Sequence, residues 1–321
     1  IYHILKECGV DAEIGGNYGI AALELNVEAK NRVFVIEVSS FQLDLLNKAK
    51  FDISILLNIT PDHLERYDTM ENYALSKRRV FERQEKGDVS IICIEQDATT
   101  QIAEWCKENL ESEVVAYTTS NVIASESEEF PYLPGQHNRQ NIIAAYYAAK
   151  NIGLCDEEII AAIKTFKGLK HRAQNIFENE KIKFINDSKA TNADATEPAL
   201  KTFDNIFWLA GGVAKSGGIE SLEKYYPKIV KAFFYGDAKD GFANTYKNSG
   251  YNNFEVLEKF KTAFDAAVKY GLEFNKNTGK QAVILLSLAC ASFDEFRNFE
   301  HRGEVFEELA NKVKIGRLFT F

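Results

Sequence analysis

The chain alternates short apolar runs with longer segments whose apolar residues recur every three or four positions. Eight apolar runs, many rich in Val, Ile and Phe, predict β-strands at residues 32–38, 52–58, 89–94, 114–118, 181–187, 205–212, 231–236 and 281–287. Such continuous runs are typical of strands covered on both faces. Helical spacing separates them, for example at residues 71–85, 139–151, 218–230 and 254–270. The order predicts an α/β fold of largely parallel sheets flanked by helices.

A change of pattern near residues 164–172 (KTFKGLKHR) predicts a domain boundary, because a helix-rich stretch ends there and a new α/β pattern begins. We expect one domain at residues 1–168 and a second at 169–321, each with its own sheet. Residues 125–135 are expected to form an exposed loop. The opening IYHILKECG has its apolar residues on one helical face, so the sequence is expected to start inside a helix, as a fragment cut within a domain would.

Composition narrows the class of protein. The 321 residues carry a formal net charge of -9, which disfavours a general nucleic-acid or anionic-membrane binder. The five cysteines are scattered without a CxxC pair, so we expect reduced thiols in a cytoplasmic protein. No apolar run reaches the roughly 18 residues of a membrane-spanning helix. We expect a cytoplasmic monomer without nucleic-acid or membrane partners.

Polar groups follow five of the predicted strands. Ligands bind beyond the carboxyl ends of strands in open parallel sheets, so these positions are candidates for a site. The groups are Glu37 with Ser39 and Ser40, Asp62 with His63, Asp187 with Ser188 and Lys189, Gly211 and Gly212 with Lys215, and Ser292 with Asp294. Five such strand ends exceed what solvation requires, although any single one could be an ordinary loop. Ser39 and Ser40 are also candidate N-caps of the next helix.

Each candidate has a simpler interpretation when it is taken alone. Glu37 is then a capping or salt-bridged acid, and His63 a hydrogen-bonded loop residue. Together they could share Mg²⁺, which prefers oxygen ligands and keeps phosphates in its shell. Lys77 stands beside Arg78 and Arg79, and composition alone favours a solvated helix face there.

Glycine-rich segments give weaker signals. GGNYG (15–19) follows a predicted helix rather than a strand, so the dinucleotide-binding fingerprint does not apply and a tight loop is expected. GGVAKSGG (211–218) is either an anion cradle built from backbone N–H groups and Lys215 or a flexible loop. No GxxxxGK[ST] motif occurs in the chain.

The segment GQHNRQN (135–141) precedes the helical pattern NIIAAYYAAKNIG. Asn138 is predicted to be the N-cap of this helix, and Gly153 lies near its end. Capping leaves His137 and Asn141 unexplained.

As a set, these motifs resemble those of the Mur ligases. The resemblance runs in order along nearly the whole chain through GGNYGIAALEL, VIEVSSFQLD, LLNITPDHLERY, YALSKRRVF, LPGQHNRQNIIAA, HRAQ, INDSKATN and LLSLACASFDEFRNFEHRG. NDSKATN and ACASFDEFRNFEHRG resemble the D-glutamate-adding members more than their siblings. The family has a nucleotide-sugar domain, a central ATPase domain and a C-terminal α/β domain. The resemblance implies an N-terminally truncated central ATP-binding domain and a Rossmann-like C-terminal domain that binds the incoming amino acid, with the P-loop upstream of Ile1.

The implied activity is an ATP- and Mg²⁺-dependent ligation in peptidoglycan precursor synthesis. ATP phosphorylates the carboxylate of a UDP-sugar-linked L-alanine (UDP-N-acetylmuramoyl-L-alanine), and the amine of D-glutamate attacks the acyl phosphate. A carboxylate is a poor electrophile, and phosphate charge must be neutralised before transfer.

The resemblance also implies roles for residues around the phosphates. Glu37 and His63 match the family's Mg²⁺ ligands. Lys77 matches a lysine that the family carbamylates with CO₂, which turns a cation into an anionic oxygen ligand and reverses the interpretation from composition. Lys77, His63 and Arg172 form the implied catalytic set, in which Arg172 stabilises phosphates by forked hydrogen bonds.

Further positions match binding segments of the family. Asn17 and Ser39 match the UDP-sugar and phosphate side. The implied ATP-binding residues are His137, Asn138 and Asn141 on the adenine side, Asp187 at the ribose and Lys189 at the phosphates. The implied D-glutamate pocket consists of Thr191, Lys215, Ser292 and Phe299.

Two departures from the family pattern concern the second domain. Val213 and Ala214 stand where the family has an acid, which affects the placement of Lys215. Leu288 stands where the family tends to have Pro, so the backbone before Ser292 is expected to be less constrained.

Two alternatives stay open: a sibling ligase that adds another amino acid, and a non-catalytic nucleotide- or metabolite-binding relic. The chain by itself is expected to be nearly inactive in ligation. We expect it to keep weak amino-acid binding and to lack ATP binding.

Overall fold

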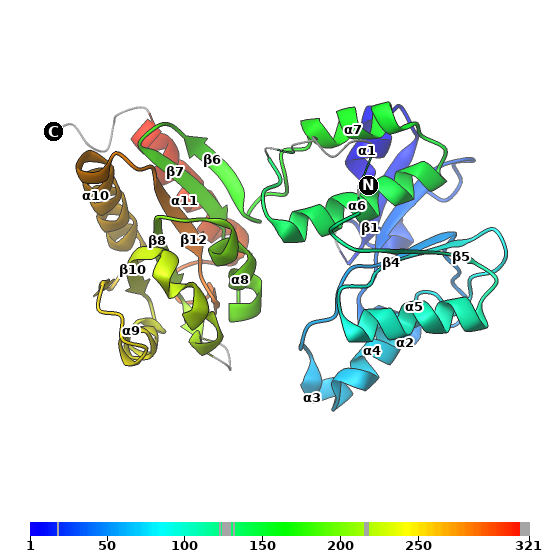
Figure 1. Cartoon of the computed structure of the whole chain (residues 1–321), viewed down its shortest axis with the longest axis horizontal. Coiled ribbons are helices and arrows are strands. Elements are labelled where there is room, and N and C mark those ends of the chain that lie inside the picture. The colour runs from blue at the N-terminus through cyan, green and yellow to red at the C-terminus, as the bar shows by residue number, and fades with distance from the viewer. Residues whose placement is uncertain (18, 122, 124–129, 131, 215–217, 315–321) are drawn as a thin grey trace. The chain divides into compact units, whose positions relative to one another are not determined.

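The computed structural model describes residues 1–17, 19–121, 123, 130, 132–214 and 218–314 (Figure 1). Contacts divide the chain into two compact units, Ile1–Phe166 and Lys167–Phe321. The motifs that resemble those of the Mur ligases fall in both units. Most of the loop predicted at 125–135 lies outside the described residues.

The first unit is built from parallel strands and short crossover helices. Its strands are β1 (Ala12–Gly16), β2 (Val33–Glu37), β3 (Ile53–Leu56), β4 (Val89–Cys93) and β5 (Glu113–Tyr117). Its helices are α1 (Tyr2–Glu7), the 3-10 turn η1 (Ala22–Glu24), α2 (Ser40–Leu45), α3 (Leu64–Tyr67), α4 (Met70–Arg78), α5 (Asp97–Asn109), α6 (Gln136–Asn151) and α7 (Asp156–Thr165).

The strands of this unit form two sheets rather than the single sheet that we predicted. One has the order β1-β2 and the other β3-β4-β5, and every pairing is parallel. β2 continues through α2 into β3, yet no described strand lies between them to complete the ladder. The prediction was wrong on this point because strand pairing is not encoded in the hydrophobic pattern of either strand.

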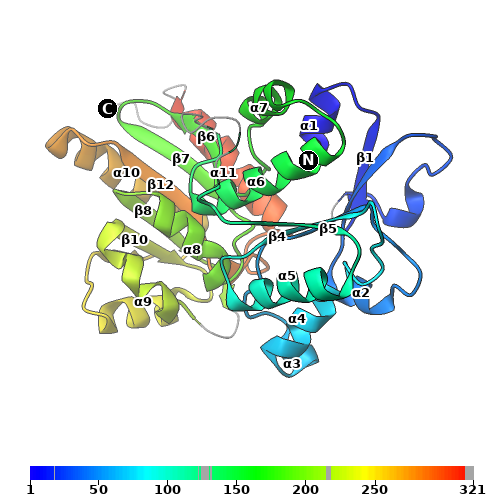
Figure 2. The same ribbon diagram turned by 45° about the vertical axis from the view of Figure 1, so that its right-hand side comes forward.

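Helices cover both faces of these strands (Figure 2). α6 packs on β4, α7 packs on α6 and α1 packs on α7 and β1, with Ile4, Ile91 and Ile143 in their shared core. On the other face α5 packs on β4 and β5, α4 on α5, and α2 on α4. The buried side chains there include Phe81 and Ile92.

The second unit contains one six-stranded sheet of order β11-β10-β8-β12-β7-β6. Its strands are β6 (Gln174–Glu178), β7 (Ile182–Asp187), β8 (Ile206–Gly211), β10 (Ile229–Tyr235), β11 (Phe254–Val256) and β12 (Ala282–Ser287). All pairings are parallel except that of the edge strand β6 with β7. The two-residue strands β9 (Val213–Ala214) and β13 (Cys290–Ala291) pair separately and antiparallel.

Two apolar cores sandwich this sheet. α8 (Ala193–Thr202), the 3-10 helix η2 (Glu220–Lys228) and α9 (Lys239–Asn248) cover one face, around the buried Trp208 and Tyr226. α10 (Phe260–Thr278) and α11 (Phe299–Lys314) cover the other, around Phe184 and Phe264. The predicted α/β class, with largely parallel sheets flanked by helices, is confirmed.

All eight predicted strands are present, and no end differs from its predicted position by more than two residues. Part of the helix predicted at 254–270 is instead β11, and the helix begins only at Phe260. The segment predicted as a helix at 218–230 is a 3-10 helix that passes into β10 at Ile229. The glycine segment 15–19 was predicted to follow a helix, and this was wrong, because Gly15 and Gly16 end β1.

No described helix is long and apolar enough to cross a membrane. All five cysteines are free thiols.

Candidate functional site

The carboxyl end of β2 brings together Glu37 and Asn17. Asn17 Nδ2 donates a 3.3 Å hydrogen bond to Glu37 Oε1, and the Asn17 backbone N–H donates to the Glu37 carbonyl at 2.8 Å. A glycine precedes Asn17 because Gly16 has φ +106° and a Cβ there would lie 2.3 Å from the Glu37 carbonyl oxygen. Both side chains are exposed at the sheet edge, where they can meet a ligand.

Ser39 is the N-cap of α2, as predicted. Its Oγ accepts a hydrogen bond from Gln42 N at 3.3 Å, and Gln42 Oε1 accepts from the Ser39 backbone N–H at 2.8 Å, which forms a capping box. Ser40 is not a cap but the first residue of the helix. The Ser39 hydroxyl also donates to Gln42 Oε1 at 3.0 Å, so a ligand at Ser39 would compete with the cap.

His63 follows β3 after a short loop and caps α3 with a left-handed backbone, φ 55°. Its ring lies between two acids, with Nε2 3.5 Å from Asp62 Oδ2 and Nδ1 3.6 Å from Glu65 Oε1. The edge-on ring of Phe41, from α2, lies 4.9 Å from the His63 ring. A non-glycine residue at positive φ is uncommon, and such residues cluster at functional sites.

Lys77 lies on α4 close to the same aromatic groups. Its Nζ stands 4.7 Å from the centre of the Tyr73 ring, and the Tyr73 ring is 6.3 Å from that of His63. Burial lowers the pKa of Lys77, although the charges of Tyr67 and Asp62 partly oppose the shift. The structure therefore brings His63 and Lys77 to one aromatic cluster. The lowered pKa means that a larger fraction of Lys77 is the neutral amine than in an exposed lysine.

The sequence analysis missed the carboxylate that anchors this region. Asp44 on α2 accepts hydrogen bonds from Ser76 Oγ at 2.6 Å, Tyr67 OH at 2.9 Å and Arg66 Nη2 at 3.2 Å. Burial pushes the pKa of Asp44 upward, but these three donors outweigh it and the net shift is downward. Asp44 thus ties α2, α3 and α4 together. The only sequence signal was an acid within the quoted segment VIEVSSFQLD.

The donor set fits a hard cation that is coordinated partly by substrate phosphates better than a metal ion that is held by protein side chains alone. Among the residues that the structure describes, no group of three His, Cys, Asp or Glu side chains is arranged so that it could hold a metal ion by itself. The recorded side-chain partner of Glu37 is Asn17, and those of His63 are Asp62 and Glu65. Mg²⁺ is commonly held by one or two carboxylates with substrate phosphates and waters completing its octahedron, so a sparse protein set suits it.

The first two turns of α6 carry the three residues implied on the adenine side. Gly135, with φ 92°, is the N-cap, so the prediction that Asn138 caps this helix was wrong. Asn138 lies inside the first turn, where its Nδ2 donates to the Pro134 carbonyl at 2.8 Å. His137 is half-buried and Asn141 is exposed.

Gln140, which the sequence analysis left unassigned, fixes this turn against the strand ends. Its Nε2 donates to the Leu57 carbonyl at 3.1 Å, and its Oε1 accepts from Asn58 Nδ2 at 3.0 Å. The Tyr117 hydroxyl donates to the Gln140 carbonyl at 3.0 Å. These bonds hold the start of α6 at the carboxyl ends of β3 and β5.

In the second unit Asp187 ends β7 in a buried position. Its Oδ2 accepts from Ser287 Oγ at 2.7 Å and its Oδ1 from the Ala173 backbone N–H at 3.0 Å. Burial raises the pKa of Asp187 to about 7, against the pull of these two donors and of Arg172. Arg172 is exposed beside this carboxylate and is available to an anion.

Lys189 and Phe299 meet at the same edge of this sheet. Lys189 Nζ lies 5.3 Å from the centre of the Phe299 ring, a cation–π distance. Phe299 is the first residue of α11, and its carbonyl accepts from Ser188 Oγ at 2.8 Å. The residues implied for ATP phosphates and for D-glutamate are therefore neighbours within this unit.

Arg302 organises this edge, and the sequence analysis did not assign it. Its side chain is 0% exposed, and burial lowers its pKa. Nε donates to Ser188 Oγ at 3.0 Å, Nη2 to the Ser188 carbonyl at 2.8 Å, and Nη1 and Nη2 to the Cys290 carbonyl at 3.3 and 3.2 Å. The planar guanidinium group of Arg302 thus joins the loop after β7 to β13 through hydrogen bonds.

The remaining residues implied for D-glutamate lie on loops around this core. Ser292 is buried directly after β13, and Thr191 is half-buried one residue before the N-cap of α8. Gly212 brings the neighbouring loop close, because a Cβ there would lie 2.1 Å from the Ala291 carbonyl oxygen. Lys215 lies outside the described residues.

The structure describes both places where the sequence departs from the family pattern. Val213 and Ala214 form β9, which pairs with β13 through backbone bonds that need no acidic side chain. Leu288 is fully buried, and its carbonyl accepts from Gly211 N at 3.3 Å. Thr196 Oγ1 accepts from Ala289 N at 3.1 Å, so hydrogen bonds hold the backbone before Ser292. That this segment is less constrained than one with Pro in place of Leu288 stays a prediction.

Comparisons with known proteins identify relatives of this chain. Residues 3–149 match the Mur ligase middle domain family. The chain is 39% identical over 334 residues to the UDP-N-acetylmuramoylalanine–D-glutamate ligase of Rickettsia bellii (strain RML369-C), covering 98% of this chain and 73% of that protein. It is 40% identical over 332 residues to the protein of the same name from Paramagnetospirillum magneticum (strain ATCC 700264 / AMB-1), covering 98% and 71%.

A solved structure shows the same fold. The crystal structure of MurF from Acinetobacter baumannii superposes with a TM-score of 0.66 at 14% identity, covering 97% of this chain and 79% of that chain. Because 39% identity extends along almost the whole sequence and across more than two thirds of the Rickettsia bellii relative, this chain belongs to the Mur ligase family.

Proposed function

We propose that this chain provides the ATP-handling and amino-acid-binding parts of a ligase that joins D-glutamate to UDP-sugar-linked L-alanine. The observation that carries the proposal is the 39% identity, over 98% of the chain, to a relative named as a D-glutamate ligase. The spatial clusters support it, because the residues that the resemblance implies gather at strand ends in both units. The reaction belongs to peptidoglycan precursor synthesis, and we place it in the cytoplasm, where ATP is supplied.

In the first unit we assign the chemistry around Lys77. Its neutral amine attacks the carbon of CO₂, forms an N–C bond and releases one proton, which leaves an anionic carbamate. The lowered pKa of Lys77 favours this step, because only the unprotonated amine is a nucleophile. The carbamate oxygens, Glu37 and His63 are the groups that would hold Mg²⁺, and the bound ion would neutralise phosphate charge.

In the second unit we assign the amino-acid and nucleotide contacts. D-Glutamate carries two carboxylates, which call for a cation together with hydroxyl and backbone donors. Thr191, Ser292 and the Phe299 region supply them, with Lys215 as the cation. Asp187 would accept from ribose hydroxyls, and Arg172 and Lys189 would hold phosphate oxygens.

The order of events follows from the chemistry of the groups. The substrate carboxylate attacks the γ-phosphorus of ATP, the bond to ADP breaks, and an acyl phosphate forms. The amine of D-glutamate then attacks the acyl carbon, and a tetrahedral intermediate collapses with loss of phosphate. The residues of this chain hold the reacting groups in place and balance their charge, which are the main tasks of a phosphoryl-transfer site.

Calorimetry on the 321-residue chain tests the amino-acid assignment. We expect weak binding of D-glutamate, with no heat from L-glutamate, L-lysine or L-alanine at the same concentrations. Ser292→Ala should weaken D-glutamate binding about tenfold, since a hydrogen bond to a charged group contributes roughly 1.5–3 kcal/mol. Ser249→Ala, after α9 at the amino-end edge of the sheet, is the matched control and should not change it.

Other outcomes have definite meanings. Preference for a neutral or basic amino acid would replace the D-glutamate assignment by a sibling ligase. Absence of binding by every amino acid tested would favour the non-catalytic relic. ATP binding is expected to be undetectable and ligation nearly absent with this chain alone, so robust ligation would contradict the expectation drawn from the absent GxxxxGK[ST] motif.

A further inference from the structure

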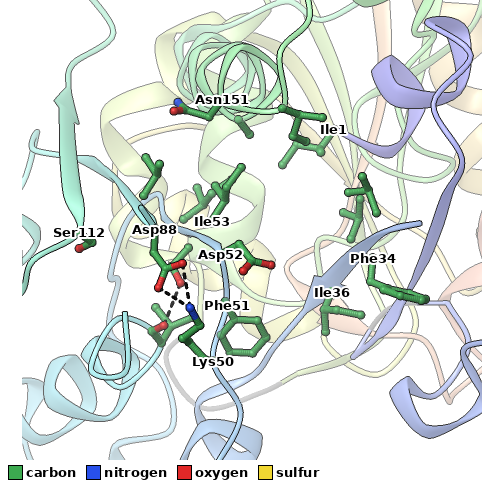
Figure 3. A pocket seen from close by; sticks show the side chains of 18 of the residues that line it. Ile1, Phe34, Ile36, Lys50, Phe51, Asp52, Ile53, Asp88, Ser112 and Asn151 are labelled. Atoms are coloured by element: carbon green, nitrogen blue, oxygen red, sulfur yellow. Dashed lines mark hydrogen bonds and ion pairs between the residues drawn. The ribbon is translucent and has the colours of Figure 1, made fainter. Parts of the chain in front are cut away.

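Two free thiols lie at the place where α1 and α7 pack on each other. Cys8 is the C-cap of α1, and Cys155 is the N-cap of α7. The two helices lie side by side in Figures 1 and 2. Neither cysteine lines the cavity of about 950 Å³ in this unit, whose walls include Ile1 and Asn151 (Figure 3). The thiols therefore belong to the interface between two helices rather than to that cavity.

Contacts along the two helices show that they run antiparallel. His3, near the start of α1, places Nε2 2.8 Å from Thr165 Oγ1, at the end of α7. Cys8, just after α1, donates from Sγ to the Glu158 carbonyl at 3.8 Å. Residue numbers therefore rise along α1 as they fall along α7. The end of α1 thus meets the first turn of α7, which Cys155 caps.

Both thiols contact the same residue of α7. The Cys155 backbone N–H donates to Glu158 Oε2 at 3.2 Å, and the Cys155 sulfur faces the Glu158 backbone N–H in a capping box. Cys8 contacts the carbonyl oxygen of Glu158. The backbone nitrogen and oxygen of one residue lie roughly 3.5 Å apart, so the two sulfurs are neighbours. Cys8 lies 150 residues from Glu158 in sequence, so no local pattern reveals this pair.

The surroundings keep both thiols protonated. Burial raises the pKa of Cys8, and the charges of Glu158, Cys155 and Glu7 raise it further. An effect of the Cys155 charge on Cys8 agrees with neighbouring sulfurs. The Glu158 backbone N–H lowers the pKa of Cys155, but the Glu158 side chain, burial and Glu157 outweigh it, and the net shift is upward. Because the thiolate is the reactive form, each thiol stays reduced until oxidant is abundant.

The two sulfurs differ from the other thiols in exposure and in position. Cys155 is exposed and Cys8 is half-buried, whereas Cys93, Cys106 and Cys290 are buried. Cys8 and Cys155 both lie at helix caps, outside the regular backbone of the helices. Rotation about one Cα–Cβ bond between staggered positions moves a cysteine sulfur by about 3 Å. A change of rotamer at one or both caps can therefore bring the sulfurs to the ~2 Å of a disulfide bond.

We propose that Cys8 and Cys155 are a redox-sensitive pair, which a peroxide converts into a disulfide that fastens the end of α1 to the start of α7. The exposed Cys155 thiolate attacks one peroxide oxygen, the O–O bond breaks, and a sulfenic acid and hydroxide form. The Cys8 thiolate then attacks the Cys155 sulfur, the S–O bond breaks, and a second hydroxide leaves. The two protons released by the thiols convert both hydroxides into water, and the sulfurs give two electrons to the peroxide.

The disulfide has two structural effects. It closes a loop of about 150 residues, which removes conformational freedom from the unfolded chain and so stabilises the folded first unit. It also withdraws the Cys155 sulfur from the Glu158 N–H and so exchanges a helix cap for a covalent bond. α7 packs on both α1 and α6, so the bond acts on this whole helix layer. The proposal concerns the first unit and does not depend on which amino acid the ligase adds.

The test compares the 321-residue chain with its variants Cys155→Ser and Cys8→Ser after exposure to hydrogen peroxide, with and without later reduction by dithiothreitol. Cys155→Ser is the matched control, because a Ser hydroxyl caps a helix well and cannot form the crosslink. Intact mass and peptide mapping report the linkage. Thermal unfolding reports its effect on the stability of the first unit.

With peroxide the parent chain should lose two hydrogen atoms in mass, and one crosslinked pair of peptides should contain Cys8 and Cys155. The Tm of the first unit should rise by roughly 5 °C or more and return to its starting value on reduction. Neither single variant should form an intramolecular disulfide, and the Tm of Cys155→Ser should not rise with peroxide.

Four results would overturn the proposal. Sulfinic or sulfonic acid at Cys155 with unmodified Cys8 would mean that the two sulfurs do not meet. A disulfide between two chains, with a yield that rises with protein concentration, would make a second copy the partner of these thiols. An intramolecular disulfide in Cys8→Ser would assign the reaction to other cysteines. An unchanged Tm in the crosslinked parent would mean that the bond does not hold the two helices together.

Discussion

Ser287 and Asp187 stand directly opposite each other on the neighbouring strands β12 and β7, and the Ser287 hydroxyl donates a 2.7 Å hydrogen bond to the Asp187 carboxylate. The pair lies 100 residues apart in sequence. It holds a buried acid at the edge where the second unit gathers its polar groups. Burial raises the pKa of this acid to about 7.

Stability of the second unit should fall as pH rises from about 4 to 7, because the folded state retains a proton that the unfolded state releases near its ordinary pKa of 3.8. Between pH 5 and 7 the loss attributable to Asp187 is roughly 2–3 kcal/mol. Asp187→Asn should remove this slope in urea unfolding, and Asp237→Asn, an exposed control, should keep it. Equal slopes in all three proteins would contradict the buried-acid interpretation.

Asp44 should behave in the opposite sense. Its folded pKa is lowered, so its contribution is present above its ordinary pKa and is lost as pH falls through the folded value. Asp44→Asn should destabilise the first unit by about 1–2 kcal/mol at pH 7, since three donors lose their charged acceptor. The difference from the parent should shrink at pH 3. Glu108→Gln, on the exposed face of α5, is the control, and a destabilisation as large in that variant would remove the specific role of Asp44.

Lys77 should react with CO₂ in the isolated chain. With ¹³C-labelled bicarbonate at pH 8, NMR should show a carbamate resonance that Lys77→Arg abolishes and Lys48→Arg leaves unchanged. The signal should decline as pH is lowered, because protonation removes the nucleophilic amine. A spectrum without a Lys77-dependent carbamate resonance would mean that the modification needs groups beyond this chain, or does not occur.

Arg302 should be intolerant even of lysine. Arg302→Lys keeps the charge but cannot reach Ser188 and Cys290 together, so we expect a loss of about 3 kcal/mol in urea unfolding of the second unit. D-Glutamate binding should weaken as the Ser292 loop loosens. Arg297→Lys, on the exposed surface before α11, is the control. Parent-like stability of Arg302→Lys would show that the fork does not hold the two loops.

The fold class could be predicted because burial on both faces leaves a local signature. Strands such as β4 and β12 are continuous apolar runs, and every predicted run became a strand. β1 was missed because its five residues, AEIGG, include a charged residue and end in two glycines. β11 was missed because it is a three-residue edge strand whose sequence continues into the pattern of α10.

Much of the candidate site could also be anticipated, because strand ends are recognisable and ligands gather there. Glu37, His63 and Asp187 were identified in this way. The residues that hold them were not. Arg302 lies 114 residues from the Ser188 that it contacts, and Asp44 lies 32 residues from Ser76. Such partners have no fixed spacing, so no local pattern reveals them.

The sequence by itself therefore determined the α/β class, the eight longer apolar strands, the two-unit organisation as an expectation, and the polar groups at the strand ends, because periodicity and burial are local properties of the chain. Only the tertiary structure decided that the described strands of the first unit form two sheets, that Asp187 is a desolvated acid, and that the buried Arg302 joins the loops of the second unit. These features depend on contacts between residues far apart in the chain, and their energies exist only once the backbone has brought those residues together.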